Sequence, residues 1–326
     1  MKKNILFILF CLLLFPLTAC KKNSEISNLN INQGNKFLKQ NNIIKKEKKL
    51  LLVSFTILED IVKNIVGNEY NVESITKPGM EVHGYQVTPS DLVRGSEAII
   101  FIQNGFGFEL WAEKFVTNLD VERITIANNL EPIFINEDIY KGKPNPHAWI
   151  SPKRGILYVD ILLEELSKLD PENKEKFKKN AQNFKNKIKK IDEDFSLFLN
   201  TLQKSKRYLV SCEGAFSYLT NDYDLKEAYL WPVNAESQIT PKRMARVINL
   251  VKEKQIPAVF CESTVSSESQ ESVAKETGAF FGGNLYVDSL SGKNGPAETY
   301  LEMLEYNLGT IKNGFNASLK NKKIKK

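Results

Sequence analysis

Histidine is scarce in this sequence, with only two among 326 residues. Nucleotide-binding motifs are missing: there is no Walker A pattern and no GxGxxG fingerprint, which argues against P-loop and dinucleotide-binding sites. Beyond the N-terminal segment, no apolar run reaches the roughly 18 residues that a transmembrane helix needs. We therefore expect a globular protein with no membrane-spanning helix after that segment.

The N-terminal segment has the pattern of an export signal. Two lysines precede an apolar run over residues 5–17, which is shorter than a membrane span. Residues 17–20, Leu-Thr-Ala-Cys, resemble the lipobox of bacterial lipoproteins, in which the cysteine is acylated after cleavage. We expect residues 1–19 to be a signal peptide and Cys20 to carry lipid. The lipid would anchor the protein to a membrane on its extracytoplasmic side, in the periplasm or at the cell surface. An ordinary signal peptide with an incidental cysteine is the alternative.

Lysine-rich segments lie at both ends of the mature chain. Residues 20–47 lack periodicity and read as a flexible tether behind the lipidated cysteine, and residues 314–326 form a basic tail. The net charge of +6 comes partly from these clusters. No aromatic residues are interleaved with the clustered lysines, so we expect a solvated tail and no nucleic-acid partner.

Strand-like and helix-like stretches alternate between these ends, which predicts parallel sheets covered by helices. The expected fold class is α/β, with one lobe of parallel sheet over residues 48–169 and a second over residues 205–313. The predicted strands lie at residues 49–55, 71–77, 98–103 and 122–127 in the first lobe and at 207–212, 226–230, 258–261 and 284–287 in the second.

Residues 170–204 predict one long rigid helix between the lobes. Apolar residues recur there at steps of four and three from Phe177 to Leu202, and most residues between them are charged or Asn. A coiled coil would show a similar stripe. The α/β patterns on both sides favour a helix within the molecule.

Two cysteines remain for a disulfide once Cys11 leaves with the leader and Cys20 is acylated. Cys212 and Cys261 each end a predicted strand of the second lobe. Neighbouring parallel strands lie about 4.8 Å apart, within the Cα separation of a disulfide, and exported proteins keep such bonds. We expect a Cys212–Cys261 disulfide; two buried, reduced cysteines are the alternative.

Four residues near strand ends form a candidate metal site. His83 and His147 lie in first-lobe loops, each shortly before a helix start, whereas Glu213 and Asp288 directly follow predicted strands of the second lobe. Ligands of open α/β sheets bind beyond the carboxyl ends of the strands. Two carboxylates would also balance the charge of a divalent cation. Taken singly, a loop histidine or a helix-capping carboxylate has a structural interpretation as well.

Five stretches of the sequence resemble the solute-binding lipoproteins of manganese, iron and zinc ABC importers. They are VHGYQVTPSDL, NPHAWISPK, CEGAFSYLTNDYDLKEAYLWPVNAE, IPAVFCESTVS and LYVDSLSG, in the family's order, and the similarity covers roughly residues 48–312. The resemblance implies two α/β lobes joined by a long helix, and an ABC permease and its ATPase as partners. It also implies four metal ligands, which are His83, His147, Glu213 and Asp288.

The donor set favours Mn²⁺ as the transported ligand. Carboxylate oxygens suit manganese, whereas zinc prefers nitrogen and sulfur donors. Zinc-type members of the family carry histidine where this chain has Glu213, and they often carry a His-rich acidic loop that this sequence lacks. Fe²⁺ and Zn²⁺ remain the alternatives, because donor chemistry alone does not exclude them.

We expect a monomeric binding protein and no enzyme. A metallohydrolase needs an open coordination position and a nearby base, but two bidentate carboxylates would fill the shell, and Glu262 is the only further acid to nominate. A surface adhesin or interaction lipoprotein is another alternative. It fits the lipid anchor and leaves the four-residue constellation unexplained.

Overall fold

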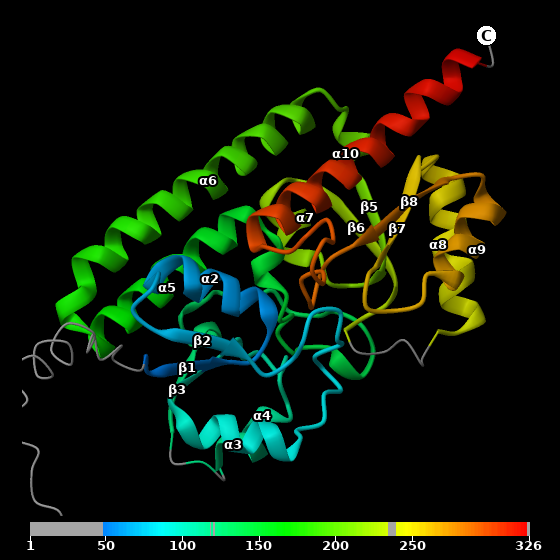
Figure 1. Cartoon of the computed structure of the whole chain (residues 1–326). Helices are drawn as coiled ribbons and strands as arrows, with labels where there is room; N and C mark the ends of the chain where they lie inside the picture. The colour runs from blue at the N-terminus through cyan, green and yellow to red at the C-terminus, as the bar shows by residue number, and fades with distance from the viewer. Residues whose placement is uncertain (1–47, 118, 120, 234–238, 325–326) are drawn as a thin grey trace, which may run out of the picture. The chain divides into compact units, whose positions relative to one another are not determined.

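The computed structural model describes residues 48–117, 119, 121–233 and 239–324 (Figure 1). The expected signal peptide, the acylation site Cys20 and the tether lie outside the described residues. No helix in the described part of the chain is long and apolar enough to cross a membrane.

The first lobe, called the N-lobe below, contains a four-stranded parallel sheet with the order β2-β1-β3-β4. Alternate residues of its central strands face opposite sides: Leu51 packs in the main core, whereas Leu52 packs with Phe115 of α4 in a smaller cluster. Burial on both faces explains the continuous apolar run of β1. The elements are β1 (Leu50–Val53), α2 (Thr56–Val66), β2 (Asn71–Ser74), α3 (Pro89–Glu97), β3 (Ala98–Gln103), α4 (Ala112–Thr117), β4 (Glu122–Thr125), η1 (Ile126–Asn129), η2 (Asp138–Tyr140), η3 (Ala148–Ile150) and α5 (Pro152–Leu169).

The second lobe, the C-lobe, has two separate parallel strand pairs, β5 with β6 and β7 with β8. β5 and β7 lie side by side and are joined by the disulfide described below. The elements are η5 (Lys204–Lys206), β5 (Tyr208–Glu213), α7 (Ser217–Asp222), β6 (Lys226–Trp231), α8 (Pro241–Lys254), β7 (Ala258–Glu262), α9 (Glu268–Thr277), β8 (Phe280–Leu285) and α10 (Tyr300–Ile324).

The last strand differs from its prediction. β8 spans Phe280–Leu285, four residues earlier at its start than the predicted 284–287. Two glycines within β8 interrupt the pattern of residues that is typical of a strand. A Cβ on Gly282 would lie 2.3 Å from Cε1 of Phe260, and Gly283 has a φ of 109°, so close packing and backbone conformation require both glycines. The prediction that Asp288 directly follows the strand is therefore wrong, because two residues separate Asp288 from the end of β8.

The long helix between the lobes is confirmed, with shorter bounds. α6 (Lys174–Asn200) follows the 3₁₀ turn η4 (Pro171–Asn173), and it runs along α5 and α2 (Figure 1). Its buried residues follow the predicted spacing of four and three from Phe177 to Phe195, and the next buried residue is Leu199 instead of the predicted Phe198. At the other end of the chain, α10 continues to Ile324, so most of the expected basic tail is helical.

One apolar core extends through both lobes. It includes Phe55 and Trp149 from the N-lobe, Phe184 from α6, and Val287 and Tyr300 from the C-lobe, all of them almost fully buried. The hydroxyl of Tyr300 donates to the carbonyl oxygen of Trp149 at 2.5 Å. The two lobes are therefore packed against each other beneath the candidate metal site.

Candidate metal centre

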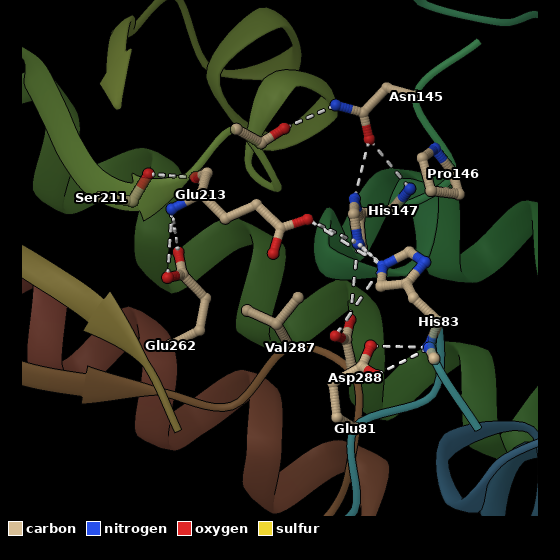
Figure 2. A network of polar contacts seen from close by, with 12 residues as sticks. Glu81, His83, Asn145, Pro146, His147, Ser211, Glu213, Glu262, Val287 and Asp288 are labelled. Carbon is tan, nitrogen blue, oxygen red and sulfur yellow. Dashed lines mark hydrogen bonds and ion pairs between the residues drawn. The ribbon is translucent and has the colours of Figure 1, made fainter. Parts of the chain in front are cut away.

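The structure brings the four candidate ligands together between the lobes (Figure 2). His83 comes from the loop between β2 and α3, and His147 lies directly before η3. Glu213 is the last residue of β5, and Asp288 lies in the loop after β8. The sequence placed all four residues near strand ends or helix starts, but their convergence depends on how the lobes are packed.

The donor atoms lie at distances suited to a single ion. The two Nε2 atoms of His83 and His147 are 3.3 Å apart. From His147 Nε2, the nearest oxygens of Asp288 and Glu213 lie at 3.4 and 3.8 Å, and from His83 Nε2 both lie at 3.9 Å. Nitrogen donors bound tetrahedrally at about 2.0–2.1 Å from an ion lie roughly 3.4 Å from one another. The four side chains therefore need little movement to surround a cation.

The site is enclosed, which makes its charge balance important. All four side chains are at most 6% exposed. Burial opposes ionisation of Asp288, but the contact with His147 and the charges of the two imidazoles hold its pKa below the ordinary value. An ionised carboxylate in such surroundings is a strong partner for a divalent cation.

Asn145 orients His147. Its Oδ1 accepts the backbone N–H of His147 at 3.0 Å and lies 3.0 Å from His147 Nδ1. Its Nδ2 donates to the carbonyl oxygen of Gly214 at 2.6 Å, which identifies Oδ1 as the acceptor. His147 Nδ1 must therefore carry the proton, and the lone pair of Nε2 faces the site.

Two further acids lie beside the ligands. Glu81, for which we predicted no role, accepts the backbone N–H groups of His83 at 2.6 Å and Gly84 at 2.7 Å. Its carboxylate belongs to a group with His83 and Asp288 in which the potential ligand atoms lie within 4.8 Å of one another. Glu262 accepts the backbone N–H of Glu213 at 3.1 and 3.2 Å, a structural role. The only sequence signal that Glu81 lies near the site is its position two residues before His83.

The expected disulfide is present between Cys212 and Cys261, with their Cα atoms 4.8 Å apart. Both cysteines are fully buried. The bond joins β5 to β7 at the residues that immediately precede Glu213 and Glu262. It therefore fixes the end of β5 from which Glu213 projects.

Protonation of His83 provides a test of the enclosure of this site. Burial lowers the pKa of His83 to about 4, against 6.5 for a free side chain, although the charge of Asp288 opposes the shift. In the metal-free protein, the His83 imidazole should titrate near pH 4 in NMR spectra. The unfolded chain then binds more protons below pH 6.5, so the free energy of unfolding should decrease as the pH falls toward 4.

The control for this titration is His83→Gln, which removes one of only two histidine signals and so assigns the resonance. The variant should also lose the part of the pH dependence of stability that His83 causes. A midpoint near 6.5 in the folded wild type would show that the imidazole is hydrated.

Known proteins with similar sequences bind metals. The family model described as "Zinc-uptake complex component A periplasmic" matches residues 51–314. The chain is 44% identical over 280 residues to the iron-binding protein YfeA of Yersinia pestis, covering 85% of this chain and 90% of YfeA. It is 30% identical over 325 residues to the metal ABC transporter substrate-binding lipoprotein SloC of Streptococcus mutans, covering 97% of this chain and 100% of SloC.

A solved structure extends the similarity to three dimensions. The Mn-bound periplasmic metal-binding protein from Candidatus Liberibacter asiaticus matches with a TM-score of 0.77 and 36% sequence identity, over 82% of this chain and 100% of that protein. The residues that the family model matches, 51–314, include all four candidate ligands.

Proposed function

The chain belongs to the ZnuA family, whose model is described as a periplasmic zinc-uptake complex component, and we propose that this member captures Mn²⁺ and delivers it to an ABC permease and its ATPase. As a member of that family it is a metal-binding component of an ABC importer. Binding and delivery are the proposed role, with no catalytic step. Mn²⁺ is favoured, and Fe²⁺ and Zn²⁺ are the competing ions.

One observation carries the choice of metal: two buried carboxylates face two imidazole Nε2 atoms across a gap of 3.4–3.9 Å. We assign His83, His147, Glu213 and Asp288 as the ligands. Oxygen donors in equal number with nitrogen donors suit Mn²⁺ or Fe²⁺ better than a zinc site rich in nitrogen and sulfur. The hydrogen bond between Asn145 and Nδ1 of His147 supports the assignment, because it turns Nε2 of His147 toward the ion.

The location of the protein follows from the same proposal. We propose that the protein is monomeric and that Cys20 is acylated. The lipid on Cys20 and the tether over residues 20–47 would then hold the protein on the extracytoplasmic side of a membrane. The support is the Leu-Thr-Ala-Cys sequence at residues 17–20 and the naming of the relative SloC as a lipoprotein.

Competition titrations of Mn²⁺, Fe²⁺ and Zn²⁺ against the wild type and Glu213→His test the proposal. Exchanging a carboxylate for an imidazole should move the ratio of the Mn²⁺ and Zn²⁺ affinities toward Zn²⁺. The affinity ratio should change at least roughly tenfold, because substitution of a residue that merely holds a metal ligand already has an effect of that size. Glu213→Gln is the control, because it removes the charge and keeps an oxygen donor.

Two results would contradict the proposal. If the wild type fails to bind Mn²⁺, Mn²⁺ is not its ligand. If Glu213→His leaves the affinity ratio unchanged, Glu213 does not select the metal. Metal analysis of protein purified from its native compartment then identifies the ion that it carries.

A further inference from the structure

The loop that carries Asp288 is hydrogen-bonded to the N-lobe, although it follows a strand of the C-lobe. The indole N–H of Trp149 donates to the carbonyl oxygen of Val287 at 2.8 Å. The backbone N–H of Gly79 donates to Ser289 Oγ at 2.7 Å and lies 3.2 Å from the carbonyl oxygen of Leu290. Asp288 therefore sits between residues that are attached to the other lobe.

Thr56 makes the central contact of this attachment. It is the first residue of α2, it follows β1 closely in the chain, and only 3% of it is exposed. Its Oγ1 accepts the backbone N–H of Leu290 at 2.9 Å and lies 3.4 Å from Ser289 Oγ. A buried N–H that loses its acceptor is costly, because water does not replace it. The hydroxyl of Thr56 thus holds the two residues that follow Asp288.

The remaining carboxylate is held differently. Glu213 is part of β5, which pairs with β6, and its backbone N–H is accepted by Glu262 of the C-lobe. His83 and His147 belong to the N-lobe. The backbone N–H of Glu213 is thus held within the C-lobe, although Asn145 of the N-lobe donates to the carbonyl oxygen of the next residue, Gly214.

We propose that Thr56 is a positioning residue for Asp288, so that the N-lobe holds in place a ligand that the C-lobe supplies. The proposal rests on the metal-binding function argued above and deepens it. Thr56 touches no ion itself. It acts through the hydroxyl of Ser289 and the backbone N–H of Leu290, and its loss lets the Asp288 carboxylate turn away from the imidazoles.

Three variants separate positioning from general stability. Thr56→Val keeps the shape of the side chain and removes its hydroxyl. Thr56→Ser restores the hydroxyl. Thr76→Val is the matched control, because Thr76 is a fully buried N-lobe threonine whose hydroxyl bonds to the carbonyl oxygen of Ser54 rather than to the Asp288 loop.

The decisive measurement is Mn²⁺ binding and its release to a chelator. Thr56→Val should bind Mn²⁺ about 10-fold to 100-fold more weakly, mainly through faster release. The electron paramagnetic resonance line shape of the bound ion should change, since the carboxylate contact changes. Thr56→Ser should restore both values to near those of the wild type, and Thr76→Val should leave both unchanged.

Hydrogen exchange of the Leu290 amide gives an independent readout that needs no metal. The amide should be protected in the wild type and in Thr56→Ser, and it should exchange faster in Thr56→Val. Unchanged Mn²⁺ release and unchanged exchange in a folded Thr56→Val would overturn the proposal. If the wild type binds no Mn²⁺, the proposed function fails, and the exchange of this amide still decides whether Thr56 holds the loop.

Discussion

Replacing Asp288 with alanine should weaken Mn²⁺ binding by about two to four orders of magnitude, because removing one partner of a buried ion pair costs roughly 3–5 kcal/mol. The carboxylate is 3% exposed and faces both imidazoles. Without it, an enclosed cation keeps only one of its two assigned carboxylate ligands, Glu213. Glu213→Ala should have an effect of the same order, and isothermal titration with Mn²⁺ measures both.

The control for these two variants is Asp91→Asn. Asp91 is a buried acid of the N-lobe that caps α3 and pairs with Arg94, and neither contact involves a candidate ligand. This variant should lose some stability and retain its Mn²⁺ affinity. Unaltered titrations of folded Asp288→Ala and Glu213→Ala would refute the assignment of the site.

Removal of the disulfide should have the largest effect on stability. Cys212 and Cys261 are 49 residues apart in sequence, and the loss of a cross-link that closes such a loop costs about 4 kcal/mol in the chain-entropy model. The double variant with Cys212→Ala and Cys261→Ala should therefore unfold at a clearly lower urea concentration than the oxidised wild type. Wild-type protein unfolded in urea with a reductant is the control for the substitutions themselves.

The same double variant tests whether the disulfide supports the metal site. Glu213 directly follows Cys212, so a looser end of β5 should lower Mn²⁺ affinity as well. If stability falls and affinity stays the same, the bond stabilises the lobe without positioning the ligand. Equal urea midpoints for the variant and the oxidised wild type would contradict the stability prediction.

Much of the fold could be predicted because its signals are local. The spacing of apolar residues in α6 and the proline at the start of α5 are visible in the sequence and agree with the structure. β8 was misplaced because Gly282 and Gly283 break the usual strand pattern, and they are explained only by the packing of Phe260 and a positive φ. The end of α6 at Asn200 was missed because the apolar spacing continues past it.

The candidate ligands could be named from the sequence, partly through family resemblance. The residues that hold these ligands in position could not. Asn145 and Glu81 lie two residues before His147 and His83, and nothing in the residue types distinguishes a side chain that orients a ligand from one that faces solvent. The contact of Thr56 with Leu290 joins residues 234 positions apart. Such contacts depend on how the lobes pack, and the local pattern of apolar and polar residues carries no information about that packing.

The shared core beneath the site has a consequence for the timing of transport. Swinging the lobes apart would expose the apolar side chains that join them, such as Trp149, Val287 and Tyr300, to water. A wide open form of the empty protein is therefore a high-energy state, and we expect spontaneous escape of the ion to be slow. Slow escape means that the protein keeps its ion between capture and delivery.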